Sequence, residues 1–348
     1  MNNSPETEAG TYSAIELVSS GEMAVVEKNQ IALEPESIRL RITATGICGS
    51  DVHGIAGNTG RREIGQVMGH ETCGVVIEVG SDADKNLLGV FGAVNPVVSC
   101  GKCEWCIRGQ EQVCEDVWII GVEASFDAAF AQELVIPQQA FVALNNLSDL
   151  ALGALVEPLA VGFQAVSRAT ISPSDRVLVI GAGPIGQAAA IAARDCGASE
   201  ILVVEPNPLR AIVAEKMGFQ VLSSESDNSE IIRRLSGKPS MVLDAVGHTA
   251  TLTRAIEISA PQASIVLVGM ASPEVTLPAY AISTKERKIL GSYCYSSKSF
   301  IDAARWLESN LDIASQMVDR RVSLGESIAV FSQLLSSEVE INKALVIP

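Results

Sequence analysis

The sequence predicts the α/β fold class, with a doubly wound parallel sheet in one domain and mostly β-strands in a second domain. Residues 175–206 read as an apolar strand, a glycine-rich turn, an alanine-rich helix and a second apolar strand, which is a βαβ unit. Continuous apolar runs follow at 241–247, 264–270 and 288–294, and such runs are typical of a sheet that helices cover on both faces. Residues 12–45 instead alternate apolar and polar side chains, which indicates half-buried strands.

Length and composition support two globular domains. A chain of 348 residues is longer than one hydrophobic core usually grows. Its 47% hydrophobic and 19% charged residues suit a protein with a substantial core. We expect residues 1–157 to form a first domain, with a cysteine-rich lobe at about 95–118, and residues 158–291 to form a dinucleotide-binding domain. Residues 292–348 are expected to return to the first domain.

The charge balance argues against nucleic acid and membrane surfaces as partners. Asp and Glu outnumber Lys and Arg by 41 to 25, and the net charge of -16 repels phosphate backbones and anionic lipids. The apolar stretch 151–166 is interrupted by Glu157 and Pro158, and it is shorter than the roughly 20 residues of a spanning helix. The N-terminal segment is polar and acidic, unlike a signal peptide, so we expect a cytoplasmic protein.

A dinucleotide-binding turn follows the first strand of the βαβ unit. Gly181, Gly183 and Gly186 match the pattern G-x-G-x-x-G within "VLVIGAGPIG". The first glycine permits a tight turn, the second lets backbone approach a pyrophosphate, and the third lets helix and strand pack closely. Backbone N–H groups at the helix N-terminus then face the phosphates. The alternative is an ordinary glycine turn in an α/β domain.

Glu205 indicates NAD rather than NADP as the cofactor. It stands nineteen positions after Gly186, at the end of the second strand. A carboxylate there can accept hydrogen bonds from a ribose diol and would repel a 2′-phosphate. Arg210 is the opposing signal, because a nearby arginine can accept that phosphate. The alternative for Glu205 is a surface side chain without a ligand.

Four cysteines predict a structural metal site. Cys100, Cys103, Cys106 and Cys114 form the pattern C-x2-C-x2-C-x7-C. Four thiolates packed this closely suit a closed tetrahedral zinc site that braces a loop and leaves no position open for water. The alternatives are an iron–sulfur cluster, unliganded thiols and a zinc ribbon that acts as an interaction module.

Three separated segments predict a second, open metal site. "GICGSDVHGIAG" supplies Cys48, "GQVMGHETCG" supplies His70 and Glu71, and "ALVEPLAVG" supplies Glu157. A carboxylate in so apolar a run as the last is costly to bury unless it is paired or bound to a metal. Cys, His and Glu ligands match a catalytic zinc with a fourth position for water or substrate. The alternatives are a small buried cysteine, a hydrogen-bonded turn histidine and a carboxylate that caps a helix.

Ser50 and His53 are predicted to carry a proton away from that metal. A zinc-bound alcohol must lose its proton before hydride leaves its carbon, and a hydroxyl followed by an imidazole of near-neutral pKa forms a short relay. The alternative is that Ser50 is a turn residue and His53 a surface residue. For Asp51 we expect only a local hydrogen bond within the turn.

The motifs GICGSDVH, GHETCGVV, the four-cysteine lobe, EPLAVG and GAGPIG together resemble the zinc-dependent medium-chain dehydrogenases over nearly the whole chain. The similarity is greatest to the branch of sorbitol (polyol), threonine and butanediol dehydrogenases. The resemblance implies a mostly-β GroES-like catalytic domain around an inserted Rossmann domain, in a homodimer or homotetramer. It also implies two zinc ions per chain: a catalytic one bound by Cys48, His70 and either Glu71 or Glu157, and a structural one in the lobe.

The activity that the resemblance implies is hydride transfer from a secondary alcohol, such as a polyol, sugar or cyclitol, to NAD, which yields a ketone. A non-catalytic zinc- and nucleotide-binding protein and a metal-free quinone reductase of the same fold are the alternatives. Polyol dehydrogenases often carry an arginine near the substrate where this chain has Cys294, which speaks against sorbitol itself. By the resemblance, the cofactor-binding residues also include Pro184, Ile185, Glu205, Arg210, Val268, Gly269, Met270, Tyr293 and Cys294.

Overall fold

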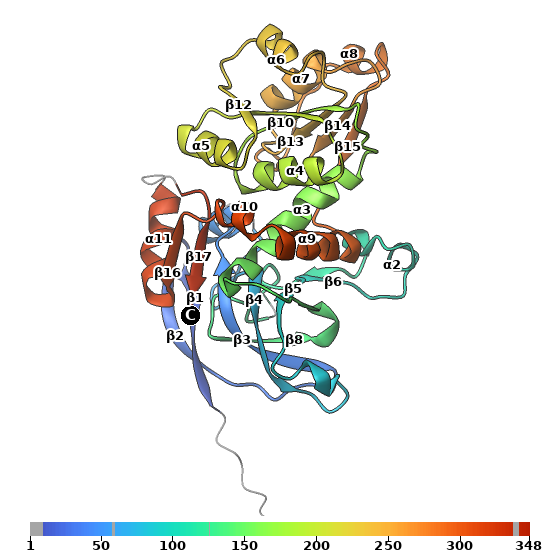
Figure 1. Cartoon of the computed structure of the whole chain (residues 1–348). Coiled ribbons are helices and arrows are strands. Elements are labelled where there is room, and N and C mark those ends of the chain that lie inside the picture. Colours follow the sequence, from blue (N-terminus) through green and yellow to red (C-terminus); the bar gives the residue numbers. More distant parts are fainter. Residues whose placement is uncertain (1–9, 58–59, 125, 337–340) are drawn as a thin grey trace, which may run out of the picture. The chain divides into compact units, whose positions relative to one another are not determined.

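The computed structural model describes residues 10–57, 60–124, 126–336 and 341–348, and it divides into two compact units (Figure 1). Unit 1 comprises Met1–Val98, Trp118–Ala154 and Arg320–Pro348, and unit 2 comprises Ser99–Val117 and Leu155–Asp319. The predicted fold class is confirmed, because unit 2 contains a six-stranded parallel sheet and unit 1 a seven-stranded mixed sheet. The lobe and residues 292–319, which the sequence analysis assigned to the first domain, cluster with unit 2.

The central sheet of unit 1 consists of β3 (Ser37–Gly46), β4 (Glu71–Val79), β5 (Phe91–Val94), β8 (Glu133–Pro137), β9 (Phe141–Ala143), β16 (Arg320–Ser323) and β17 (Ala344–Ile347). Its order is β16-β17-β3-β4-β5-β9, and β8 pairs with β3. β3 therefore has two long-range neighbours near its C-terminal end. Gly46 lies opposite Glu71 of β4 and opposite Leu345 of β17. This register brings residues near positions 47, 71 and 343 together.

The other elements of unit 1 complete its core. They are the hairpins β1 (Thr11–Ser19) with β2 (Glu22–Asn29) and β6 (Val97–Val98) with β7 (Trp118–Ile119), the helices α1 (Gly49–Ile55) and α11 (Leu324–Ser336), and the short 3₁₀ helices η1 (Lys85–Leu87) and η3 (Gln138–Ala140). Phe331 of α11 packs edge-to-face on Phe130, with ring centroids 5.1 Å apart. Both rings are almost fully buried, so the C-terminal helix is part of the core of unit 1.

Unit 2 is built on the strands β10 (Arg176–Ile180), β11 (Glu200–Val204), β12 (Gln220–Leu222), β13 (Met241–Asp244), β14 (Ser264–Leu267) and β15 (Lys288–Gly291), in the order β12-β11-β10-β13-β14-β15. The connecting helices are α4 (Pro184–Asp195), α5 (Pro208–Lys216), α6 (Asn228–Arg234), α7 (Thr249–Ile258) and α8 (Ala279–Ser283). Val177, Leu178 and Val179 of the central strand β10 are all 0% exposed. Burial on both faces explains why these strands read as continuous apolar runs.

Contacts of α9 explain why the lobe and residues 292–319 belong to unit 2. These segments contain α2 (Glu104–Ile107), η2 (Glu111–Val113), α9 (Ser297–Ser309) and α10 (Leu311–Ser315), and α9 packs on α3 (Val156–Ser167). Gln164 of α3 accepts hydrogen bonds from the Ser296 backbone N–H at 3.2 Å and the Ser299 hydroxyl at 2.9 Å. Glu111 of the lobe accepts a hydrogen bond from the Ser297 backbone N–H at 3.3 Å.

The apolar segment Leu150–Ser167 contains η4 (Leu150–Leu155) and α3. By length and composition alone it could cross a membrane, but 83% of it is buried inside the protein. Gly162 explains part of this burial. A Cβ atom there would lie 2.4 Å from the backbone of Ala188, so the glycine lets α3 and α4 approach closely. The segment is therefore packed as a core helix.

Candidate metal and cofactor sites

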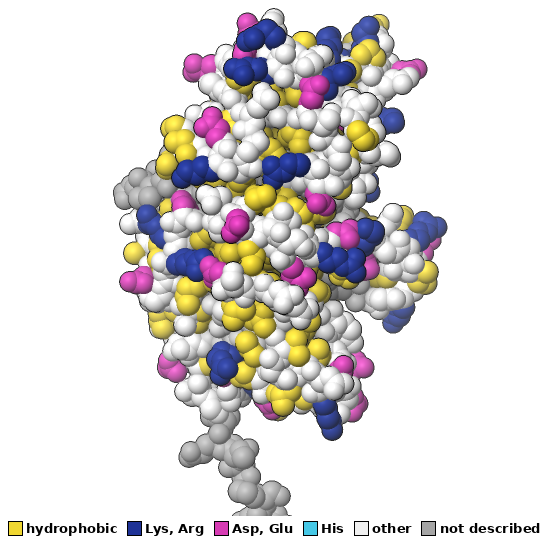
Figure 2. All heavy atoms as spheres, viewed as in Figure 1, with side chains coloured by type: hydrophobic (Ala, Val, Ile, Leu, Met, Phe, Trp, Pro, Cys, Tyr) yellow, Lys and Arg dark blue, Asp and Glu magenta, His cyan; other side chains and the backbone are white. Residues whose placement is uncertain are grey.

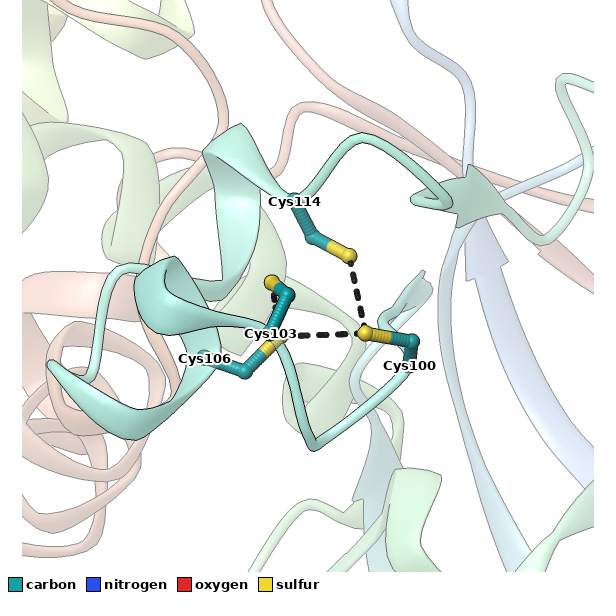
Figure 3. Close-up of side chains that lie close together, drawn as sticks. All are labelled: Cys100, Cys103, Cys106 and Cys114. Carbon is teal, nitrogen blue, oxygen red and sulfur yellow. Dashed lines mark hydrogen bonds between the residues drawn. The ribbon is translucent and has the colours of Figure 1, made fainter.

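The four lobe cysteines lie around one point, and Figure 3 shows their sulfur atoms facing one another. The Sγ–Sγ distances are 3.5 Å from Cys100 to Cys114, 3.9 Å from Cys100 to Cys106 and 3.4 Å from Cys103 to Cys106. Tetrahedral zinc with Zn–S bonds of about 2.3 Å requires sulfurs about 3.8 Å apart. Hydrogen bonds from the backbone of Lys102 and Cys103 lower the pKa of the Cys100 thiol to about 6, which favours the thiolate that binds metal. The cluster therefore fits a closed structural zinc site.

Replacing Cys100 by serine should remove one zinc ion per chain and lower the melting temperature. Structural zinc contributes directly to folding free energy, and four ligands from one short segment tie the loop of the lobe together. A loss of several kcal/mol corresponds to a shift of roughly 2–4 °C per kcal/mol in a unit of this size. Metal analysis and thermal unfolding check both effects. The control is Cys196→Ser, which alters an exposed thiol outside both cysteine-containing clusters of the described residues. Unchanged zinc content in Cys100→Ser would contradict this assignment.

Cys48, His70 and Glu71 form a second cluster, in which one ligand atom of each lies within 4.8 Å of the others. The pairing of β3 with β4 sets this arrangement, because Glu71 begins β4 and Cys48 follows β3 as the residue that precedes α1. Gly46 leaves space for the Glu71 carboxylate, since a Cβ atom at position 46 would lie 2.1 Å from Glu71 Oε2. A thiolate, an imidazole and a carboxylate on separate segments are a donor set that zinc accepts.

Asp51 lies beside His70 within this cluster. Its Oδ2 accepts a hydrogen bond from the Cys48 backbone N–H at 3.1 Å, which is the local bond expected from the sequence. Its Oδ1 also lies 3.4 Å from His70 Nδ1, a contact that sequence reasoning missed. Nε2 is thus the ring nitrogen that remains for a metal.

The same pair shifts both pKa values. Burial lowers the pKa of His70, but the Asp51 carboxylate raises it well above its usual value. Burial raises the pKa of Asp51, and the charges of His70 and Arg62 outweigh this effect and lower it. The site therefore favours a negatively charged Asp51 beside a strongly basic imidazole.

Glu71 has a partner that the sequence analysis did not identify. Lys343 Nζ donates to Glu71 Oε1 at 2.8 Å, to Glu71 Oε2 at 2.7 Å and to the carbonyl oxygen of Ile47 at 3.1 Å. Lys343 is 3% exposed and Glu71 is 0% exposed. The ion pair is therefore desolvated, and it compensates the charge of a carboxylate that also lies beside Cys48 and His70.

Glu157, the other predicted carboxylate ligand, lies in the first turn of α3 in unit 2. It is 9% exposed, and it accepts a hydrogen bond from the Tyr295 hydroxyl at 2.8 Å. Tyr295 is fully buried and was not predicted as a site residue. The neighbouring Cys294 has a positive φ of 43°, at a bend of the chain between β15 and α9. The structure thus gives the buried Glu157 a specific polar partner.

Ser50 and His53 lie on α1, directly after Cys48. Residues three apart are neighbours on a helix surface, and both side chains are exposed in unit 1. A hydroxyl and an imidazole on the same face are an arrangement that can pass a proton to solvent.

The glycine turn of unit 2 has the geometry that the motif predicts. Gly181 has φ of 93°, and Gly183 is the N-cap of α4 with Pro184 as its first residue. A Cβ atom at Gly186 would lie 1.9 Å from the carbonyl oxygen of Gly181, so no larger residue fits there. Ile185 then follows in the first turn of α4, whose N-terminal N–H groups are available to phosphate.

Glu205 joins this turn to the end of β11. Its Oε2 accepts the Ala182 backbone N–H at 2.5 Å, and its Oε1 accepts the Asn207 backbone N–H at 2.8 Å. Each carboxylate oxygen retains a lone pair for a ribose hydroxyl. The sequence analysis predicted the ribose role but not these backbone bonds, which hold the carboxylate beside the glycine turn.

The other predicted cofactor residues lie in unit 2 as well. Arg210 Nη1 is 3.9 Å from the Cβ position of Gly183, so its guanidinium lies near the turn. Gly269 follows β14 in close contact with the backbone of Val246, which a Cβ atom would approach to 2.2 Å. Val268 is buried, whereas Met270 is 76% exposed and Tyr293 is 39% exposed.

Comparison with known proteins decides the family. Residues 34–146 match the alcohol dehydrogenase GroES-like domain, and residues 184–309 match the zinc-binding dehydrogenase domain. L-Idonate 5-dehydrogenase of Vitis vinifera is 31% identical over 275 residues, covering 76% of this chain and 75% of that protein. The probable D-xylulose reductase A of Arthroderma otae is 30% identical over 312 residues, covering 86% of this chain and 87% of that protein. The chain belongs to the zinc-binding dehydrogenase family.

A solved structure agrees with this membership. The short chain alcohol dehydrogenase of Escherichia coli CFT073, complexed with the cofactor NADH, matches the chain with a TM-score of 0.88 at 25% identity. The match covers 97% of this chain and 99% of that chain. The resemblance to zinc-dependent medium-chain dehydrogenases is therefore confirmed. For a member of the zinc-binding dehydrogenase family, the four-cysteine cluster of the lobe is a fitting structural zinc site.

Proposed function

We propose that the protein oxidises a secondary alcohol of the polyol, sugar or cyclitol class to a ketone, with zinc and NAD as cofactors. The observation that carries the proposal is the cluster of Cys48, His70 and Glu71 in a chain of this family. The relatives named above act, by their names, on L-idonate and D-xylulose, which supports a polyhydroxylated substrate. A dehydrogenase of the threonine or butanediol type is the second candidate.

Each group of residues has a distinct role in this reaction. When bound, zinc lowers the pKa of a coordinated alcohol and NAD accepts the hydride from its carbon. Cys48 and His70 hold the metal, and Asp51 fixes the orientation of the His70 ring. Ser50 would accept the alcohol proton while its own hydroxyl proton passes on toward His53, whose imidazole would release a proton to solvent. Gly181, Gly183 and Gly186 let the backbone cradle the pyrophosphate, and Glu205 accepts hydrogen bonds from the ribose.

The third protein ligand is Glu71 or Glu157. Proximity supports Glu71, because its carboxylate lies with Cys48 and His70. The bonds from Lys343 already use part of the acceptor capacity of both Glu71 oxygens and compensate their charge, which supports Glu157. Glu157 is a buried carboxylate that accepts a hydrogen bond from the Tyr295 hydroxyl, and a buried carboxylate is also a group that a metal can compensate.

Absorbance of NADH in a screen of polyols, sugars, cyclitols and amino alcohols tests the proposal. We expect turnover with one or more polyhydroxylated secondary alcohols and dependence on bound zinc. No turnover over the whole panel with both NAD and NADP would contradict the proposal and favour a non-catalytic binding protein. Turnover of a quinone by protein without zinc would favour a metal-free reductase of this fold.

Glu205→Gln should shift the cofactor preference toward NADP. The substitution removes the negative charge that repels a 2′-phosphate and keeps the length of the side chain. We expect the ratio of the NADP and NAD dissociation constants to fall by about 10-fold, or about 1.4 kcal/mol. Fluorescence titration with both cofactors measures it. Glu215→Gln on α5, an exposed carboxylate, is the control. An unchanged ratio would show that Glu205 does not take part in recognition of the ribose.

We also propose that the protein is a cytoplasmic homo-oligomer with small-molecule alcohols and ketones as its substrates. Tyr280 is 86% exposed and Met270 is 76% exposed in unit 2, and β15 is an edge strand of its sheet, which supports a second copy as a partner. The net charge of -16 makes nucleic acid and anionic membranes poor partners. Figure 2 shows basic and acidic side chains interspersed on the face that it draws, so the charge argument rests on the whole sequence. Sedimentation equilibrium measures the assembly.

A further inference from the structure

Arg62 is a buried cation beside the predicted catalytic metal site. Its side chain is 4% exposed, and its Nη2 lies 3.6 Å from Asp51 Oδ1. The same oxygen lies 3.4 Å from His70 Nδ1. One carboxylate oxygen thus faces both a permanent cation and a candidate metal ligand, while the other accepts the Cys48 backbone N–H.

Neighbouring residues provide a hydrogen-bond acceptor and space for the Arg62 side chain. Arg62 Nη1 donates to the carbonyl oxygen of Val122 at 3.1 Å, which fixes one arm of the guanidinium. Gly54 lies inside α1 where the arginine stem passes, and a Cβ atom there would lie 2.6 Å from Arg62 Cγ. A glycine within a helix costs about 1 kcal/mol relative to alanine. Gly54 therefore makes α1 less stable than alanine would, but it leaves room for the Arg62 side chain.

The neighbouring Arg61 is far more exposed than Arg62. Its side chain is 49% exposed, and its Nη2 lies 3.6 Å from Glu123 Oε1 at the surface. Adjacent arginines thus provide a matched pair, one buried against Asp51 and one exposed.

The contact between Arg62 and Asp51 matters because both side chains are buried. Asp51 is 0% exposed, and an isolated carboxylate at such depth is unfavourable without a compensating charge. Arg62 supplies that charge and confines the carboxylate to an orientation in which Oδ1 faces His70. Loss of a residue that orients a metal-ligating histidine typically costs 10–100-fold in metal affinity or activity.

We propose that Arg62 is a positioning residue for the catalytic zinc, which acts through Asp51 to hold His70 in its metal-binding orientation. The inference rests on the proposed function, because it requires a zinc ion at Cys48 and His70. It extends that function to a residue that touches neither the metal nor the substrate. The fixed charge and geometry of Arg62 make the site bind zinc more tightly.

Zinc release from the full-length protein to a chromophoric chelator tests this role. The wild type should release zinc in two phases, one from each site. Arg62→Met should accelerate the phase of the catalytic zinc by about 10-fold or more and leave the lobe phase unchanged. Arg62→Lys keeps the charge but loses the fork of donors, so it should restore part of the wild-type rate. Arg61→Met is the matched control and should release zinc as the wild type does.

Two additional variants separate the outcomes. Gly54→Ala leaves Arg62 in the sequence but displaces its stem, so it should accelerate the same phase even if Arg62→Met fails to fold. Cys48→Ala identifies the catalytic phase by removing it. If Cys48→Ala removes a phase but Arg62→Met and Gly54→Ala leave its rate unchanged, or accelerate both phases equally, the positioning role is wrong. If Cys48→Ala removes no phase, the proposed function fails, and this inference fails with it.

Discussion

Cys48→Ala should abolish alcohol oxidation and leave NAD binding essentially intact. The substitution removes a thiolate from the predicted catalytic zinc site, and a metal that acts as a Lewis acid contributes several kcal/mol to transition-state stabilisation. We expect kcat/KM to fall by at least about 1,000-fold, or about 4 kcal/mol. The dissociation constant of NAD should change little, because the glycine turn and Glu205 belong to unit 2 and Cys48 to unit 1. Steady-state kinetics and a fluorescence titration with NAD measure the two effects.

Cys73→Ala is the matched control for this substitution. Cys73 is a buried thiol of unit 1 outside both cysteine-containing clusters, and burial raises its pKa to about 12. A neutral thiol of this kind contributes packing rather than chemistry, so most activity should remain. Equal losses of turnover and NAD binding in Cys48→Ala would contradict the separation of roles between the two units.

Lys343→Met should cost about 3–5 kcal/mol of unfolding free energy, the largest stability effect that we expect from a single substitution in unit 1. The substitution removes the cation from a buried ion pair and leaves the Glu71 carboxylate desolvated and uncompensated. Methionine keeps the length and most of the volume of the lysine stem. Urea unfolding monitored by circular dichroism measures the loss.

Two comparisons separate this charge effect from packing. Lys298→Met changes a lysine whose side chain is 82% exposed and paired with Asp302, and it should have little effect. The double variant Lys343→Met with Glu71→Gln removes both charges and should recover much of the lost stability. If Lys343→Met is no less stable than Lys298→Met, the ion pair does not contribute in the way that its burial indicates.

The features of the structure that the sequence predicts best are those that depend on local spacing. The glycine turn, its helix and Glu205 lie within one βαβ unit, so a single stretch of sequence specifies their geometry. The four lobe cysteines lie within fifteen residues, and few loop conformations bring their sulfurs together. Both features could be derived from residue type and position alone. Element ends were less accurate: the apolar run 288–294 forms a strand only to Gly291, because the chain bends at Cys294.

The contacts that the sequence analysis missed are set by sheet pairing and burial. Lys343 reaches Glu71 across 272 positions because β17 and β4 both pair with β3. Arg62 reaches Asp51 because a glycine of α1 leaves room for it, and no spacing rule predicts that fit. Asp51 was expected to bond only within its turn, since nothing in the local sequence relates it to His70. Partners of buried charges could be identified only after the packing of unit 1 was known.

Anomalous scattering at the zinc absorption edge from crystals of the active protein would locate both zinc ions. We expect two peaks per chain, one enclosed by Cys100, Cys103, Cys106 and Cys114 and one in contact with Cys48 Sγ and His70 Nε2. The second peak would also identify Glu71 or Glu157 as the third protein ligand. A single peak within the lobe, from protein that still oxidises alcohols with NAD, would rule out a catalytic zinc at Cys48 and His70.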